Sequence, residues 1–262
     1  MKYLRIKAIL LQESFLSFRS LEIIMDLVFF PIMSIIVFGF LSIYLSGFNN
    51  FSIGRGVLLG MLLWQVIWIV QYSVALGSLW NIWSRNLSNL FVTPLTVREY
   101  IFAQAFSGIL KMFIIFLGSS VVCFYFFNFN ILDIGIANLA IVILNLMLFG
   151  FALGLVILGL IFRFGTRIQA FAWGILPFFQ PITAAFYPVS VLPPFLQNVA
   201  YTLPPTYVFE ATRGILNGLP MDMHQMSTAL LLNIFYLTLA IISFDYNFKK
   251  SKESGQFARN EG

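Results

Sequence analysis

Six long apolar stretches constrain the fold of this 262-residue chain more than any other feature of its sequence. A helix rises about 1.5 Å per residue, so about 20 apolar residues are needed to cross a hydrocarbon core of roughly 30 Å. The stretches cover residues 23–45, 57–79, 100–127, 134–161, 168–189 and 226–244. Hydrophobic residues make up 60% of the chain and charged residues 10%. The sequence therefore predicts an all-α integral membrane protein with six transmembrane helices.

The lysines and arginines predict how these helices are oriented, because basic residues in short loops tend to stay on the cytoplasmic side. With six crossings, one side of the membrane receives only Arg55 and Arg213. The other side receives Lys2, Arg5, Lys7, Arg19, Arg85, Arg98, Arg163, Arg167, Lys249, Lys250, Lys252 and Arg259. We therefore expect a multi-pass protein of the cell inner (plasma) membrane with both termini in the cytoplasm. Basic residues at segment ends, and not on one face, also argue against nucleic-acid binding.

Residues 1–20 predict an amphipathic helix that lies on the cytoplasmic leaflet. One helical stripe carries Leu4, Ala8, Leu11, Phe15 and Phe18, and the opposite side carries Lys2, Arg5, Gln12 and Arg19. Gln12, Glu13 and Arg19 interrupt the apolar core that a cleavable signal peptide needs, so we expect this segment to be retained. A basic tail required only for topology is the alternative interpretation.

The cytoplasmic loop of residues 79–98 contains a second segment that does not span the membrane. Its pattern predicts a short amphipathic helix over residues 80–91, stopped by Pro94. The apolar residues at helical spacing are Trp80, Trp83, Leu87, Leu90 and Phe91, beside Asn81, Arg85, Asn86 and Asn89. Thr96 and Glu99 have the spacing of a capping box for the next helix. Because tryptophan favours membrane interfaces, this pattern fits a membrane anchor as well as a protein-docking helix.

An apolar outer segment between the fifth and sixth stretches is divided into pieces too short to cross the membrane. The dividing residues are Pro188, Pro193, Pro194, Pro204 and Pro205, and Asn217 with Gly218 provides a helix stop. We expect a re-entrant helical hairpin over residues 191–217 that enters the outer leaflet and packs against protein, because backbone at that depth must be hydrogen-bonded. An ordinary extracellular loop is the alternative.

Residues suited to catalysis or metal binding are scarce, so no catalytic, cofactor-binding or metal site is expected on this chain. His224 is the sole histidine and is expected at the surface, and Cys123 is the sole cysteine. The sequence contains no Walker loop, HExxH motif or nucleophile elbow. Lys111, inside the third stretch, is expected to snorkel, to form an ion pair, or to contact an anionic substrate or headgroup. Glu210 and Arg213, three residues apart, are expected to pair.

Taken together, these segments resemble the permease subunits of ABC type-2 exporters over nearly the whole chain. The resemblance is carried by five motifs: Pro181-x6-Pro188, Val191-Leu-Pro-Pro-Phe-Leu-Gln197, Leu203-Pro-Pro-Thr-Tyr207, Glu210-Ala-Thr-Arg213-Gly214 and Trp83-Ser-Arg-Asn-Leu-x-Asn-Leu-Phe-Val-Thr-Pro-Leu95. It implies one transmembrane domain over residues 1–262. That domain would comprise the interfacial helix 1–20, spans one to four with the coupling helix (23–161), spans five and six with the outer hairpin (168–244), and a cytoplasmic tail (245–262).

The resemblance also implies a mechanism. Two such permeases would pair, and each would dock a separate ATP-binding subunit whose ATP and Mg²⁺ drive an amphipathic or lipid-linked substrate outward. Coupling to that subunit would involve Trp80, Trp83, Arg85, Leu87, Leu90 and Phe91. The exit would be lined by Pro193, Pro194, Pro204, Pro205, Tyr207, Glu210 and Arg213. Spans one, two and five would lie at the dimer seam. A secondary carrier, a membrane-embedded lipid- or glycan-modifying enzyme and a non-transporting scaffold are the alternatives.

Overall fold

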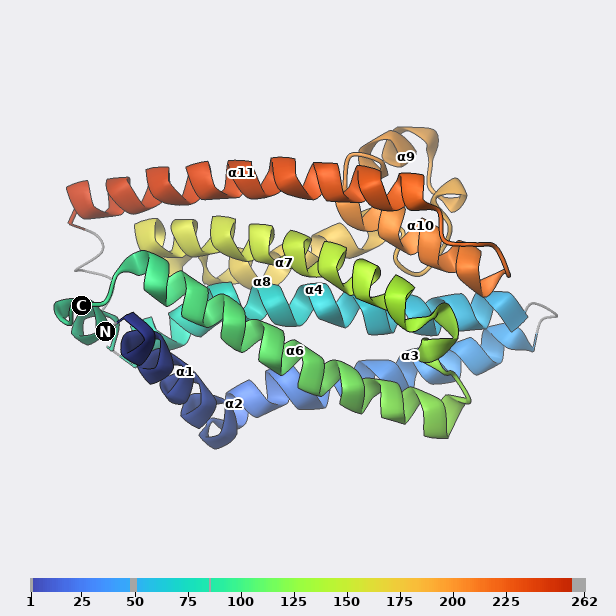
Figure 1. Ribbon diagram of the computed structural model, residues 1–262, viewed down its shortest axis with the longest axis horizontal. Coiled ribbons are helices and arrows are strands. Elements are labelled where there is room, and N and C mark those ends of the chain that lie inside the picture. The colour runs from blue at the N-terminus through green and yellow to red at the C-terminus, as the bar shows by residue number, and fades with distance from the viewer. Residues whose placement is uncertain (1, 48–50, 85, 256–262) are drawn as a thin grey trace.

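A computed structural model describes residues 2–47, 51–84 and 86–255. Within these ranges the chain forms helices and connecting turns, and its long helices run roughly side by side along the longest axis of the molecule (Figure 1). The start of α1 (Lys2–Arg19) and the end of α11 (Met223–Glu253) lie at one end of this bundle. The short helices α9 (Pro194–Ala200) and α10 (Pro204–Leu216) lie at the opposite end.

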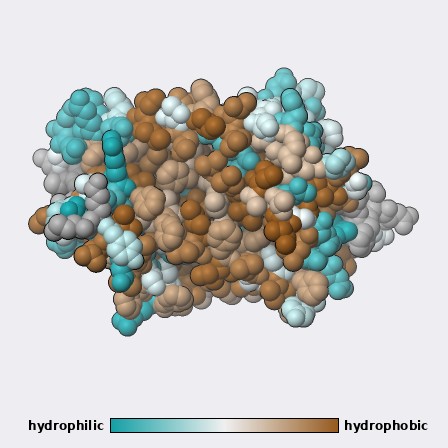
Figure 2. All heavy atoms as spheres, viewed as in Figure 1, coloured by the Kyte–Doolittle hydropathy of each residue, from teal (hydrophilic) through white to brown (hydrophobic). Residues whose placement is uncertain are grey.

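Five helical runs of the described chain are long and apolar enough to cross a membrane: Leu21–Ser46, Ile53–Trp83, Val97–Phe127, Ile136–Ile182 and Met223–Glu253. The first run joins α2 (Leu21–Ile24), the π-helical η1 (Met25–Phe29) and α3 (Phe30–Ser46). The second and third correspond to α4 (Phe51–Trp83) and α6 (Val97–Phe127). Figure 2 shows an apolar belt around the middle of the molecule between two hydrophilic ends, the pattern expected of a protein whose solvent is lipid.

The fourth run contains two helices, which explains why five candidate runs stand where six were predicted. Helix α7 (Ile136–Phe164) ends at Gly165, whose φ of 63° is unfavourable for other residues, and η3 (Gly165–Ile168) leads into α8 (Gln169–Ile182). The chain reverses direction there. This is shown by the contact of Phe179 in α8 with Phe149 in α7, whose ring centroids lie 6.1 Å apart. Helix α8 has 14 residues, about 21 Å, so the stretch predicted at 168–189 was too long.

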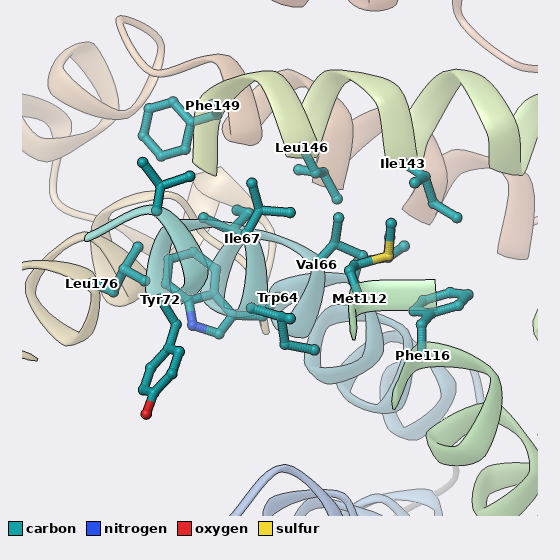
Figure 3. Packing of buried hydrophobic residues seen from close by; sticks show 14 of the residues in the cluster. Trp64, Val66, Ile67, Tyr72, Met112, Phe116, Ile143, Leu146, Phe149 and Leu176 are labelled. Carbon is teal, nitrogen blue, oxygen red and sulfur yellow. The ribbon is translucent and has the colours of Figure 1, made fainter. Parts of the chain in front are cut away.

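Helix α4 occupies the centre of the bundle and packs against α3, α6, α7, α8 and α10. Most of its residues between Val57 and Ile82 are buried. Figure 3 shows Trp64 and Ile67 of α4 within a cluster that also contains Leu146 of α7 and Met112 of α6. Burial of apolar surface gains little in lipid, so helices there depend on close van der Waals packing.

Close backbone approach produces that packing at one position in particular. A Cβ atom at Gly150 of α7 would lie 2.8 Å from the backbone oxygen of Ile67 in α4. Glycine therefore allows these two helices to approach more closely than any larger residue would allow. Helix α11 packs along the other side of α7, where the side-chain amide of Asn233 donates to the backbone oxygen of Asn145 at 3.0 Å.

Candidate coupling site

Helix α1 lies against α6 with its apolar stripe facing away from the protein. Leu4, Leu11, Phe15 and Phe18 are exposed, whereas Ile9 on the other side of α1 is buried. The predicted amphipathic helix therefore forms, and its apolar stripe is free to contact lipid.

The side of α1 that faces the protein carries a buried carboxylate. Glu13 is 3% exposed, and its Oε2 atom lies 2.9 Å from Nζ of Lys111 in α6. Its Oε1 atom accepts a hydrogen bond of 2.9 Å from Nε2 of Gln104, also in α6. Of the roles predicted for Lys111, the structure shows the ion pair. A buried carboxylate with both an ion-pair partner and a hydrogen-bond donor has its loss of hydration largely compensated.

The hydroxyl of Tyr100 extends this polar contact from α6 to the end of α4. It accepts hydrogen bonds from Gln104 Nε2 at 3.2 Å and from Asn81 Nδ2 at 3.1 Å, and lies 2.9 Å from Oγ of Ser78. Asn81 Oδ1 in turn accepts a hydrogen bond of 2.8 Å from Gln12 Nε2 of α1. We call Gln12, Glu13, Asn81, Tyr100, Gln104 and Lys111 the polar network. It joins α1, α4 and α6 near the end of the bundle that holds α1.

The helix predicted over residues 80–91 is wrong as a single element. Trp80 and Trp83 belong to the last turn of α4, and a separate helix α5 covers Leu87–Val92. The amide N–H of Asn86 donates to the carbonyl of Asn81 at 2.8 Å, and Asn86 occupies the N-cap position of α5. The prediction failed because the apolar periodicity continues without a break from the span into the loop, whereas the helix itself is interrupted between α4 and α5.

The C-terminal part of the loop, which leads from α5 to α6, is fixed to α1 and to the start of α6. The predicted capping box is confirmed, since the Thr96 hydroxyl accepts from the Glu99 N–H and the Glu99 carboxylate accepts from the Thr96 N–H. Nη1 of Arg5 donates to the carbonyl of Pro94 at 2.5 Å and lies 3.4 Å from Oε2 of Glu99. Helix α5 is therefore held between the polar network on one side and Arg5 on the other.

The residues expected to couple to a partner divide between α4 and α5. Trp80 and Trp83 pack edge to face with ring centroids 4.8 Å apart, and Trp83 is 38% exposed. Leu90 packs against the main core. The backbones of Leu87 and Phe91 belong to α5, and Arg85 lies outside the described residues. Val92 was not predicted as a coupling residue, yet it is 86% exposed at the end of α5.

The outer segment contains η4 (Val189–Val191), α9 and α10, with Pro194 in the first turn of α9 and Pro204 and Pro205 in that of α10. Two further residues predicted at the exit belong to the same segment: Pro193 directly precedes α9, and Tyr207 within α10 packs against Tyr201 with ring centroids 5.7 Å apart.

The predicted pair of Glu210 and Arg213 is confirmed, with 2.5 Å between Oε1 and Nη1. Nη2 of Arg213 also donates to the carbonyl of Ala184 at 2.6 Å, and Glu210 Oε1 accepts from the Val189 N–H at 2.9 Å. Burial lowers the pKa of the Arg213 guanidinium from its ordinary value, and the adjacent Glu210 carboxylate opposes that shift. The pair therefore attaches α10 to the backbone of residues 184–189.

Sequence reasoning missed most of the polar network, although one signal was present. Tyr100, Gln104, Ser107 and Lys111 recur at helical spacing and form a polar stripe on an otherwise apolar helix. A polar stripe within a span indicates a protein-facing side. Among the described residues, no group of three His, Cys, Asp or Glu side chains could hold a metal ion.

The apolar belt, the long helices and the polar end with its short helix α5 define a multi-span integral membrane protein. A family model described as ABC-2 type transporter matches residues 5–217, and the chain therefore belongs to the ABC-2 type transporter family as a membrane permease. The match covers both the polar network and the outer segment. Permeases of this family are transport components that generally pair with ABC ATP-binding subunits. A comparison with curated proteins gave no match.

Proposed function

We propose that this chain is the permease subunit of an ATP-driven ABC exporter in the inner membrane. Two copies, or this chain and a homologous permease, pair and dock separate ATP-binding subunits that hold ATP and Mg²⁺. Hydrolysis on those subunits moves an amphipathic or lipid-linked substrate outward. Membership of the ABC-2 type transporter family supports this proposal at the level of the class. The attachment of α5 supports it at the level of mechanism.

That attachment is the observation that carries the proposal. On the Trp83 side, Asn81 bonds to Gln12 of α1 and to Tyr100 of α6. On the Pro94 side, Arg5 of α1 bonds to the loop directly. A partner that displaces α5 therefore pulls on α1 and α6 through short hydrogen bonds, because no long slack connector lies between them.

The proposed topology has six crossings with both termini in the cytoplasm; α8 begins the fifth, and residues 183–189 complete it. Support comes from the reversal of the chain at Gly165 and from the twelve basic residues on the expected cytoplasmic side. In this arrangement α1 and α5 face the ATP-binding subunits, and α9 and α10 lie at the exit. Spans one and five form the dimer seam; the second span, α4, was also expected there, but it is buried at the centre of the bundle.

A site-specific crosslink tests which partner α5 contacts. A photoreactive amino acid would replace Val92, and the same residue at Leu219, which is 61% exposed at the opposite end of the bundle, would serve as the control. We expect the Val92 position, and not the Leu219 position, to crosslink to an ATP-binding subunit that mass spectrometry identifies in native membranes. If neither position yields a nucleotide-binding protein and none co-purifies with the intact chain, a secondary carrier becomes the better assignment.

A second experiment tests coupling. Reversal of the charge at Arg85 combined with Leu87→Asp is expected to abolish transport and the stimulation of ATPase activity while leaving the permease in the membrane. An apolar-to-charged change in a docking helix disrupts a protein interface because the new charge loses its hydration. Full transport with normal ATPase stimulation in this variant would contradict the assignment of α5 and the adjoining loop as the coupling element.

A further inference from the structure

A cavity of about 330 Å³ lies between the first span, α4 and α8, away from the polar network. Its lining combines aromatic and apolar residues with four polar side chains. The polar residues are Asp26, Ser34, Gln65 and Gln180, and the aromatic residues are Phe30, Trp64, Trp68 and Trp173. Its volume is within the range of small-molecule sites, which are concave and mostly apolar with a few polar groups that fix orientation.

Asp26 places a carboxylate in the lining of this cavity. The Tyr72 hydroxyl donates to its Oδ2 atom at 2.9 Å, and Figure 3 shows this hydroxyl pointing away from the apolar cluster. Among the described residues, no lysine, arginine or histidine lies within ion-pair distance of Asp26. Asp26 is partly buried near the start of the first span, and a bound cation would complement its carboxylate.

The cavity walls suit a cation with an apolar body. The rings of Trp68 and Trp173 lie 6.4 Å apart, and Tyr72 packs edge to face on Trp173 at 5.9 Å. Indole faces attract organic cations through the ring quadrupole. Gln65 is 2% exposed and donates from Nε2 to the carbonyl of Pro31, but its Oε1 atom has no hydrogen-bond partner among the described residues. That buried oxygen is an acceptor available to a ligand N–H or O–H group.

We propose that this cavity binds an amphipathic organic cation, with its positive charge at Asp26 and its apolar body against Trp68 and Trp173. The inference rests on the proposed function, since it assigns the substrate class of that permease. Tyr72, which donates to Asp26, also connects the cavity to the end of α4. Nε1 of Trp80 donates to the Tyr72 hydroxyl at 3.2 Å, so two successive hydrogen bonds lead from the end of α4 to the Asp26 carboxylate.

The test compares two ions of nearly equal size and opposite charge, tetraphenylphosphonium and tetraphenylborate. Binding to the full-length permease in nanodiscs would be measured by isothermal titration calorimetry, with empty nanodiscs of the same lipid subtracted to remove partitioning. We expect saturable binding of the cation and no saturable binding of the anion. Asp26→Asn should weaken cation binding about tenfold, because it removes the charge while keeping an acceptor for Tyr72. Trp173→Leu should weaken it roughly threefold.

Asp245→Asn is the matched control, because Asp245 is an exposed carboxylate on α11 that does not line the cavity. This control should bind the cation as the unmodified protein does. Equal cation binding by Asp26→Asn and the unmodified protein would overturn the inference, and so would saturable anion binding. If Asp26→Asn does not fold, Trp173→Leu and the two-ion comparison still decide. The assay requires no ATP-binding subunit, so its result is separate from the crosslinking result at Val92.

Discussion

The Nζ atom of Lys111 in α6 lies 2.9 Å from Oε2 of Glu13 in α1, which joins two residues that are 98 positions apart in the sequence. Both side chains are largely buried. The Glu13 carboxylate, in the N-terminal helix α1, therefore neutralises a lysine that lies inside an apolar span. This pair fixes the position of α1 on the bundle, and so the position of every loop contact that α1 makes.

Breaking this pair from one side should destabilise the protein more than removing both charges. Glu13→Gln leaves Lys111 buried without a counter-charge and should cost about 3 kcal/mol of unfolding free energy. The double variant Glu13→Gln with Lys111→Met should recover most of that loss. Denaturant titration of the purified permease, followed by tryptophan fluorescence, measures both values. Glu253→Gln, which removes an exposed pair with Lys250, is the control and should leave the midpoint unchanged. Equal losses in the single and double variants would contradict this account.

Removal of the Tyr100 hydroxyl should weaken the polar network without creating a large cavity. Tyr100→Phe leaves the side-chain amides of Asn81 and Gln104 with one hydrogen bond fewer, and we expect a loss of about 1–2 kcal/mol. Tyr125→Phe, at a position that is 75% exposed, is the matched control and should be neutral. Thermal unfolding of the two variants in the same detergent checks the difference. A Tyr100→Phe variant as stable as the control would mean that the network contributes no net stability.

Gly60 of α4 should not tolerate a side chain. A Cβ atom there would overlap the carbonyl of Ala185, so Gly60→Ala must push α4 away from the backbone of Ala185. We expect a loss of about 1–3 kcal/mol. Gly118→Ala is the control, because a Cβ atom at Gly118 of α6 meets nothing within 4 Å, and it should gain up to about 1 kcal/mol from helix propensity. Comparable unfolding midpoints for the two variants would show that α4 does not contact residue 185 closely.

Arg213→Lys should loosen the attachment of α10 while keeping the positive charge. One ammonium group does not reproduce the forked contact of the guanidinium with Glu210 and the Ala184 carbonyl, so we expect a loss of about 1–2 kcal/mol. Hydrogen–deuterium exchange should rise in residues 184–191 and stay unchanged in α6. Arg167→Lys, at an exposed position, is the control. Unchanged exchange in residues 184–191 would rule out this role for Arg213.

The sequence predicted best the features that depend on near neighbours. The capping box of Thr96 and Glu99 and the pair of Glu210 and Arg213 each involve residues three apart, so helical geometry alone brings them together. The apolar stretches also predicted the positions of most long helices, although α11 continues as far as Glu253 into the segment expected as a tail.

Features that depend on distant residues were not predicted. The end of α4 within the expected 80–91 helix is fixed in part by Asn81, whose partner Gln12 lies 69 positions away. The role of Glu13 depends on Lys111 and Gln104, and no local pattern identifies those partners. In each case a tertiary contact decides between local conformations of similar energy.

Helix α4 is unbroken from Phe51 to Trp83, which makes it about 50 Å long. At one end its last turn carries Asn81 and Trp83, and near the other end Gly60 touches the backbone of residue 185. In the proposed exporter, a tilt of this stiff helix would move the loop that meets an ATP-binding subunit together with the segment on the far side of the membrane. Closure on one side and opening on the other would then be one motion of one helix, with no separate signal to carry between them.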